Sequence, residues 1–147
     1  MVAPGGVPAR LSRSAVAVHP DGEPALPPTR ASVVRTATMF RGLPYLWSGT
    51  SGFGLDCSGL TSLDYRVHGI TIPRDSSPQS ENGTAVAHPR PGDLRFYATD
   101  GNVHHVSMYL GHGRMVHSPG TGQTVEVIAT STPGYAEEYA GARRYLP

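Results

Sequence analysis

Apolar positions in the first half of the chain recur at helical spacing. Val33, Ala37 and Phe40 are three or four residues apart, and Gly42 and Pro44 end the pattern. Such spacing is typical of a helix that buries one face, and a glycine followed by a proline is a common stop signal. We therefore expect a first helix that begins near Ser32.

A second helical pattern follows a glycine-rich turn at residues 48–54. Leu60, Leu63 and Val67 share one face, and Gly69 comes just after the pattern. Asp56 precedes the first turn, and aspartate is a good N-cap because its carboxylate accepts a hydrogen bond from a free backbone N–H. This predicts a second helix that begins at Asp56.

The second half of the chain has a strand-like alternation of apolar and polar residues. We expect strands at Leu94–Tyr97, Val103–Leu110, Arg114–His117, Thr124–Ile128 and Ala142–Leu146, separated by turn signals such as Asp100-Gly101 and Pro119-Gly120. Helices followed by an antiparallel meander indicate an α+β domain. The short alternation Ser14–Val18 predicts one further edge strand.

The first thirty residues differ in composition from the rest. Residues 1–30 contain six prolines and read as a tail or linker, which leaves residues 31–147 as the folded domain. The first ten residues have no apolar stretch of the kind found in a secretion signal. We interpret residues 1–30 as a segment of a longer protein, such as the tail of a preceding domain.

Composition and charge narrow the functional classes. The chain has 147 residues, 38% of them hydrophobic, which fits one globular domain. Its net charge of +1 does not indicate a nucleic-acid-binding surface. No apolar run reaches the roughly 18 residues of a membrane span, so no membrane insertion is expected. All twelve basic residues are arginine. The absence of lysine excludes a phosphate-loop lysine and a Schiff-base lysine.

The single cysteine, Cys57, lies in the first turn of the second predicted helix. One cysteine forms no intramolecular disulfide, so the fold depends on its core. Free N–H groups and the helix dipole favour a thiolate there, and the thiolate is the form that attacks a carbonyl. The alternative is that Cys57 is a small buried hydrophobe.

Two of the seven histidines are candidates for the base that a thiol needs. His105 lies on the more polar face of its predicted strand, and its neighbour His104 lies on the opposite face. His117 ends the next strand, which a tight turn pairs antiparallel with the first, so it can lie beside His105. We expect the others to be solvated or structural: His19, His88 and His112 in loops, and His68 at a helix end.

A metal site is the competing use of the same side chains. His104, His105, His112 and His117 are all possible zinc ligands. The chain lacks the H-E-x-x-H and C-x-x-C spacings, and His104 and His105 face opposite sides of one strand. We therefore predict neither a metal nor another cofactor.

Several segments, in order, resemble one known family. They are Arg41–Thr50, Phe53–Leu60, Ile72–Ser76, Arg90–Leu94, His105–Gly111, Met115–Ser118 and Tyr139–Arg144. Together they make the chain similar, over residues 32–146, to the NlpC family of bacterial cell-wall cysteine peptidases. The resemblance implies a compact papain-like fold, with a cysteine-bearing helix packed on an antiparallel sheet that carries histidine.

The resemblance also implies a substrate and a set of site residues. Such enzymes cut peptidoglycan stem peptides, often between D-glutamate and diaminopimelate or lysine. By this likeness Cys57 is the nucleophile, His105 the general base and His117 the third polar residue. Tyr45 matches a tyrosine that positions substrate or stabilises the oxyanion. Four further residues match positions near the substrate groove: Asp56, Ser58, Arg74 and Ser76.

The chain departs from the family pattern at three positions. Ser48 and Ser107 stand where glycine is usual, and Arg95 stands where an apolar residue is usual. These departures leave the catalytic groups in place but make substrate choice less certain. Two alternatives stay open: a thioester-forming acyltransferase, amide ligase or amidase with a non-wall substrate, and a non-catalytic wall-binding module. We expect a monomer that is secreted or associated with the cell wall, with a cytoplasmic enzyme as the alternative.

Overall fold

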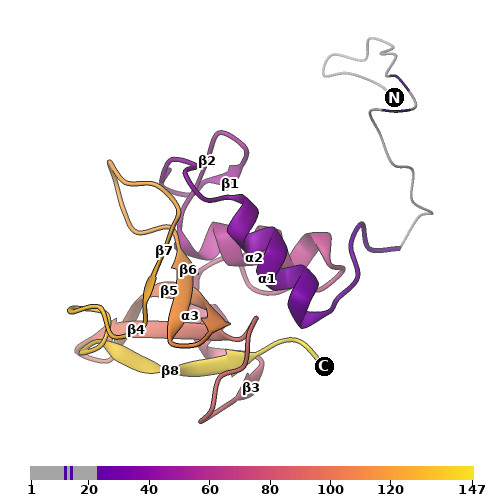
Figure 1. Cartoon of the computed structure of the whole chain (residues 1–147). Coiled ribbons are helices and arrows are strands. Elements are labelled where there is room, and N and C mark those ends of the chain that lie inside the picture. Colours follow the sequence, from indigo (N-terminus) through magenta and orange to yellow (C-terminus); the bar gives the residue numbers. More distant parts are fainter. Residues whose placement is uncertain (1–11, 13, 15–22) are drawn as a thin grey trace.

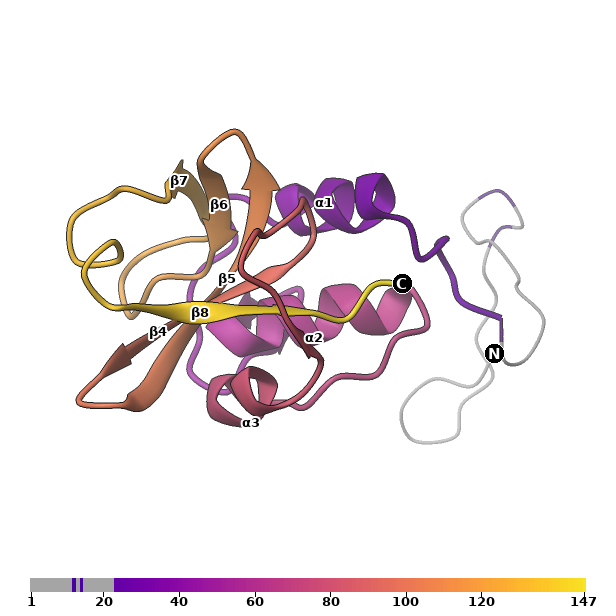
Figure 2. The same ribbon diagram turned by 90° about the horizontal axis from the view of Figure 1, so that it is seen from below.

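Three helices pack on a six-stranded antiparallel sheet in the computed structural model, which describes residues 12, 14 and 23–147 (Figures 1 and 2). The sheet order is β3-β8-β4-β5-β6-β7, and β1 and β2 form a separate ladder. The elements are α1 (Arg30–Met39), β1 (Thr50–Ser51), β2 (Gly54–Leu55), α2 (Cys57–Val67), α3 (Ser76–Glu81), β3 (Thr84–Ala85), β4 (Leu94–Thr99), β5 (Asn102–Gly111), β6 (Arg114–His117), β7 (Glu126–Ala129) and β8 (Tyr139–Arg144). The predicted α+β class is confirmed.

The two predicted helices are present, with the expected start signal in the second. Asp56 caps α2, and its carboxylate accepts a 2.6 Å hydrogen bond from the Gly59 N–H. α1 begins at Arg30, slightly before the predicted start, because Thr29 caps it and accepts from the Ser32 N–H. The described helices include none with the length and apolar character that crossing a bilayer requires.

The predicted strands are present with shifted ends. β6 has the predicted bounds, β4 and β5 are slightly longer than expected, and β8 begins three residues before the predicted Ala142. The short elements α3, β1, β2 and β3 were not predicted. Most of the edge strand predicted at Ser14–Val18 lies outside the described residues, and the boundary between residues 30 and 31 stays a prediction.

The core lies between α2 and β5, and it fixes the start of α2 against the sheet. Leu60 and Tyr65 of α2 are fully buried, as are Val106 and Met108 of β5. The Tyr65 hydroxyl also donates a 2.5 Å hydrogen bond to the Gly92 carbonyl. α2 therefore presents its first residue, Cys57, beside the strand that carries His105.

Candidate active site

A cavity of about 710 Å³ opens at the N-terminal end of α2. Of the eight residues predicted for the site, six line this cavity: Tyr45, Asp56, Cys57, Ser58, Ser76 and His105. Arg74 and His117 do not line it; each lies behind a residue that does. The backbone thus brings the predicted residues of α2, β5 and the start of α3 to one opening.

Cys57 is the first residue of α2 and is 9% exposed. Burial raises the pKa of the thiol, whereas the backbone N–H groups of Val106 and Ser58 lower it. The donors at the helix start favour the thiolate as expected, but desolvation outweighs them, so the pKa of Cys57 is raised overall. The resting group is a thiol, and it needs a base before it can attack.

His105 and His117 form a hydrogen-bonded pair, as the predicted strand pairing suggested. β5 and β6 are antiparallel, with Met108 opposite Val116, and the hairpin turn brings the two imidazoles together. His105 Nε2 and His117 Nδ1 are 2.9 Å apart. This bond uses Nε2 of His105 and leaves Nδ1 as the nitrogen available to the cavity.

Burial keeps both imidazoles neutral. It lowers the pKa of His105 to about 3, with further lowering from His117 and His104. Burial also lowers the pKa of His117 to about 4. A neutral imidazole has a free lone pair, so His105 can accept a proton at neutral pH.

Arg74 secures the start of α2 from the side. Its guanidinium donates to both carboxylate oxygens of Asp56, at 3.0 and 2.7 Å, and to the Ser58 hydroxyl at 2.9 Å. Such a two-pronged pair fixes geometry as well as charge. The negative charge of Asp56 is thereby balanced, although its side chain lines the cavity.

The departures from the family pattern have local explanations. Ser48 has a φ of 58°, a conformation that favours glycine, and it lines the cavity. Ser107 is buried, and its hydroxyl lies 2.8 Å from the Tyr97 hydroxyl. The Arg95 guanidinium lies 4.0 Å from the centre of the Tyr139 ring, a cation–π contact.

Several cavity residues were not predicted. Tyr135, from the segment between β7 and β8, packs its ring edge-on against His117 at 4.9 Å between centroids. Trp47 is 81% exposed at the rim. Asp75 and Glu138 add two carboxylates to the lining. These residues lie in loops, where apolar periodicity gives no signal.

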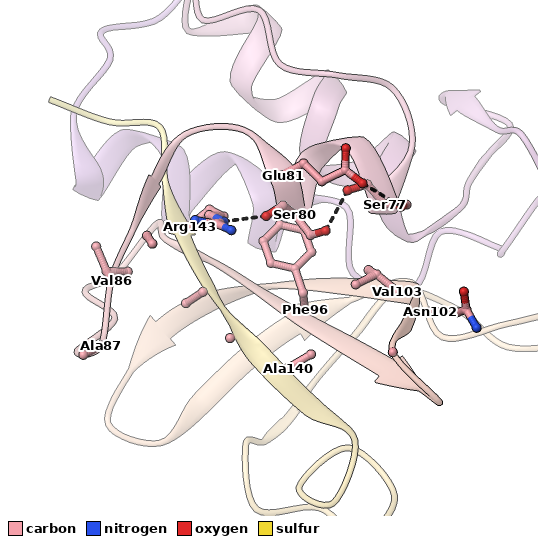
Figure 3. Close-up of a pocket in the computed structure, with 14 residues that line it drawn as sticks. Ser77, Ser80, Glu81, Val86, Ala87, Phe96, Asn102, Val103, Ala140 and Arg143 are labelled. Carbon is pink, nitrogen blue, oxygen red and sulfur yellow. Dashed lines mark hydrogen bonds between the residues drawn. The ribbon is translucent and has the colours of Figure 1, made fainter.

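A second cavity, of about 760 Å³, lies between α3, β8 and the β4–β5 hairpin (Figure 3). The described residues that line it include neither cysteine nor histidine. Its polar groups are engaged with each other: Arg143 donates to the Ser80 carbonyl at 2.5 Å, and the Ser80 hydroxyl donates to the Ser77 carbonyl at 2.7 Å (Figure 3). The candidate active site is therefore the smaller cavity, which holds the thiol. Among the described residues, no group of three or more histidine, cysteine or acidic side chains is arranged to hold a metal ion.

Sequence comparison places this geometry among known proteins. Residues 42–144 match the NlpC/P60 family. The gamma-D-glutamyl-L-lysine dipeptidyl-peptidase of Bacillus cereus is 60% identical over 125 residues, which cover 82% of this chain and 38% of that protein. The Bacillus subtilis protein of the same name is 40% identical, covering 79% of this chain and 41% of that protein. The chain thus spans about two fifths of the length of these curated relatives.

Solved structures agree with the sequence comparison. An NlpC/P60 family protein from Bacillus cereus superposes with a TM-score of 0.84 at 56% identity, covering 88% of this chain and 44% of that one. The NlpC/P60 domain of the peptidoglycan hydrolase SagA superposes with a TM-score of 0.69 at 33% identity, covering 79% of this chain and 98% of that one. The match to a nearly complete SagA domain supports the fold.

Proposed function

The chain belongs to the NlpC/P60 family, and on this premise we propose that it is a cysteine endopeptidase acting on peptidoglycan stem peptides. One observation carries the proposal: a cavity holds Cys57 at a helix start together with His105, which is hydrogen-bonded to His117. A thiol, an imidazole and a group that orients the imidazole are the parts that amide cleavage through a thioester requires.

The reaction begins with proton transfer from the Cys57 thiol to Nδ1 of His105. The sulfur attacks the scissile carbonyl carbon, and the C–N bond breaks as His105 returns the proton to the leaving amine. Water then attacks the thioester while His105 takes a proton from it. The acid product leaves, and the proton held by His105 restores the thiol.

Two donors are candidates for stabilising the negative oxygen of the tetrahedral intermediate. The Cys57 backbone N–H lies at the helix start, where N–H groups lack partners within the helix. The Tyr45 hydroxyl is the second. Burial raises the pKa of Tyr45, and the neighbouring Cys57 and Asp56 raise it further, although Arg74 opposes them, so the hydroxyl keeps its proton and can donate it.

The charges in the cavity suit a substrate with a free amine. Arg74 balances Asp56, while Asp75 and Glu138 place two more carboxylates in the lining. The third residue of a stem peptide, lysine or diaminopimelate, carries a free amine on its side chain. The name of the Bacillus cereus relative specifies a D-glutamyl-lysine bond. We propose the same kind of bond here, between D-glutamate and lysine or diaminopimelate, and a site of action at the cell wall.

The test is to incubate the protein with purified stem peptides and identify the products by mass spectrometry. We expect a cut between the second and third residues, which Cys57→Ala abolishes. Ser80→Ala in the second cavity is the matched control and should cleave normally. Cleavage by Cys57→Ala would refute the mechanism. If an added amine is captured in place of water, the enzyme is a transferase. If no stem peptide is cleaved, the proposed substrate is wrong.

A further inference from the structure

We propose that Glu126 is a positioning residue that acts through His117 and holds His105 in the tautomer that accepts the Cys57 proton. The proposal rests on the proposed function, because a thiol-based reaction is what requires this tautomer. Glu126 lies at the start of β7 and does not line the cavity. Its effect is therefore transmitted through the histidine pair.

The second nitrogen of His117 motivates the proposal. His117 uses Nδ1 for the bond to His105, and its Nε2 is buried without a hydrogen-bond partner among the described residues. Glu126 Oε1 lies 3.5 Å from this Nε2. That distance is within ion-pair range and slightly long for a hydrogen bond, so a small rotation of the glutamate closes it.

The strand register holds Glu126 in this place. β6 and β7 are antiparallel, and His117 is directly opposite Glu126. Residues directly opposite each other share a face of the sheet, with their Cβ atoms about 5 Å apart. The His117 side chain is fully buried, whereas that of Glu126 is 49% exposed. The carboxylate therefore keeps part of its hydration while it reaches a buried ring, and this limits the cost of its charge.

The position of one proton connects Glu126 to the thiol. For Nδ1 of His105 to accept from Cys57, its Nε2 must carry the hydrogen and donate it to Nδ1 of His117. His117 must then carry its own hydrogen on Nε2, which is the nitrogen that faces Glu126. A carboxylate favours this arrangement because it accepts from Nε2–H. Without it, His117 can hold its hydrogen on Nδ1, which forces His105 into the tautomer that cannot act as a base.

The other groups around the pair do not replace Glu126. Tyr135 packs on both imidazoles, with its ring centroid 5.4 Å from that of His105 and 4.9 Å from that of His117. Burial raises the pKa of Tyr135, and the nearby charge of Glu126 raises it further, so its phenol stays neutral. His104 is half exposed and pairs with Glu138 at 3.4 Å. Glu126 is thus the carboxylate that meets the buried end of the histidine pair.

The test compares Glu126→Ala, Glu126→Gln and the control Glu81→Gln, an exposed carboxylate outside the active-site cavity. Two readouts are used: kcat and KM on a cleaved stem peptide, and ¹⁵N NMR shifts of the imidazoles, which report the tautomer directly. The glutamine amide oxygen can still accept from Nε2–H, whereas alanine cannot. Near-UV circular dichroism checks that each variant is folded.

We expect Glu126→Ala to lower kcat about tenfold or more with little change in KM, since misplacing a general base removes part of its contribution. The ¹⁵N shifts should show that His117 no longer holds its hydrogen only on Nε2. Glu126→Gln should recover most of kcat and the wild-type shifts.

Two results would overturn the proposal: a kcat for Glu126→Ala equal to that of the control, or unchanged imidazole shifts whatever the rate. If the wild type cleaves no stem peptide, the proposed function fails, and the NMR shifts still decide the role of Glu126.

Discussion

Two histidines of this protein, His105 and His68, are both buried but serve different ends. His105 contacts His117 within 2.9 Å and lies in the cavity that holds Cys57. His68 ends α2 and is 1% exposed; its Nδ1 lies 2.8 Å from the Pro27 carbonyl and its Nε2 lies 3.2 Å from the Thr36 hydroxyl. Both nitrogens of His68 are engaged, whereas Nδ1 of His105 has no hydrogen-bond partner within the described part of the chain.

The two surroundings also differ in what they join. His68 ties α2 to α1 and to the segment before it, and the carboxylate nearest in its own helix, Asp64, is 3.5 Å away and fully buried. His105 instead joins two strands to a nucleophile. A buried histidine next to a hydroxyl and a carboxylate is therefore not a sign of catalysis by itself. A free nitrogen that faces an accessible cavity makes the difference.

The largest expected difference between the two histidines is the loss of activity when the imidazole of His105 is removed. We expect His105→Ala to lower kcat by roughly 10²–10⁴-fold, the usual contribution of general acid–base catalysis. The free energy of unfolding should fall as well, because the variant loses the hydrogen bond to His117 and the packing of a buried ring, so kcat is compared per folded molecule. Stem-peptide cleavage and urea unfolding measure the two effects. His88→Ala, at an exposed position, is the control; equal activity of the two variants would contradict the assignment.

The second prediction concerns the carboxyl group near His68. Burial raises the pKa of Asp64 to about 8, and neither of its oxygens has a hydrogen-bond partner among the described residues. The folded state therefore binds more protons than the unfolded state between about pH 4 and pH 8, so Asp64 lowers stability as pH rises through this window.

Asp64→Asn should remove this dependence. At pH 4 the two proteins should be similar, and at pH 8 the variant should be more stable by up to several kcal/mol, at about 1.4 kcal/mol per pKa unit. Urea unfolding at both values measures it, with Asp100→Asn in an exposed turn as control. A variant that is less stable at pH 8 would indicate instead that Asp64 is ionised and paired with His68.

The sequence predicted those features of the fold and the site that depend on local signals. The Asp56 cap, the β6 bounds and the pairing of His105 with His117 follow from capping preference, alternation and a tight turn. Asp64 also had a signal: it lies four residues after Leu60 and four before His68, on the buried stripe of α2. His68 was correctly predicted to be structural. Its ring is held by hydrogen bonds to Pro27 and Thr36, and not by a charge interaction at an exposed helix end.

The missed parts depend on register and on loops. α3 has six residues, includes Pro78 and buries only Gln79, so it shows no apolar period. Glu126 meets His117 through a strand pairing that spans residues 118–125, and a single sequence does not reveal that register. Tyr135 reaches the histidines from a loop. Side chains brought together by tertiary packing leave little local trace in the sequence.

Removal of the structural histidine should lower stability without lowering kcat, in contrast to removal of His105. We expect His68→Ala to lower the free energy of unfolding by about 2–3 kcal/mol, because two hydrogen bonds of about 1 kcal/mol each are lost and a small cavity forms. kcat per folded molecule should stay at the wild-type value. Urea unfolding and active-site titration with a thiol reagent check both. A large loss of kcat in fully folded His68→Ala would mean that the two histidines are not separate in function.

The smallest expected effect is the response of activity to mild acid. Burial and His117 lower the pKa of His105 to about 3, so the base is still neutral at pH 5. kcat/KM at pH 5 should be within about twofold of its value at pH 7, whereas a base with the ordinary pKa of about 6.5 would lose roughly 25-fold.

Stability should fall over the same range, because the unfolded state takes up protons on His105 and His117 below about pH 6.5 and the folded state does not. Short assays on a stem peptide, with circular dichroism recorded at each pH, separate the two effects. An acid limb near pH 6.5 in folded protein would contradict the lowered pKa of His105, because a base that is neutral at pH 5 gives no such limb.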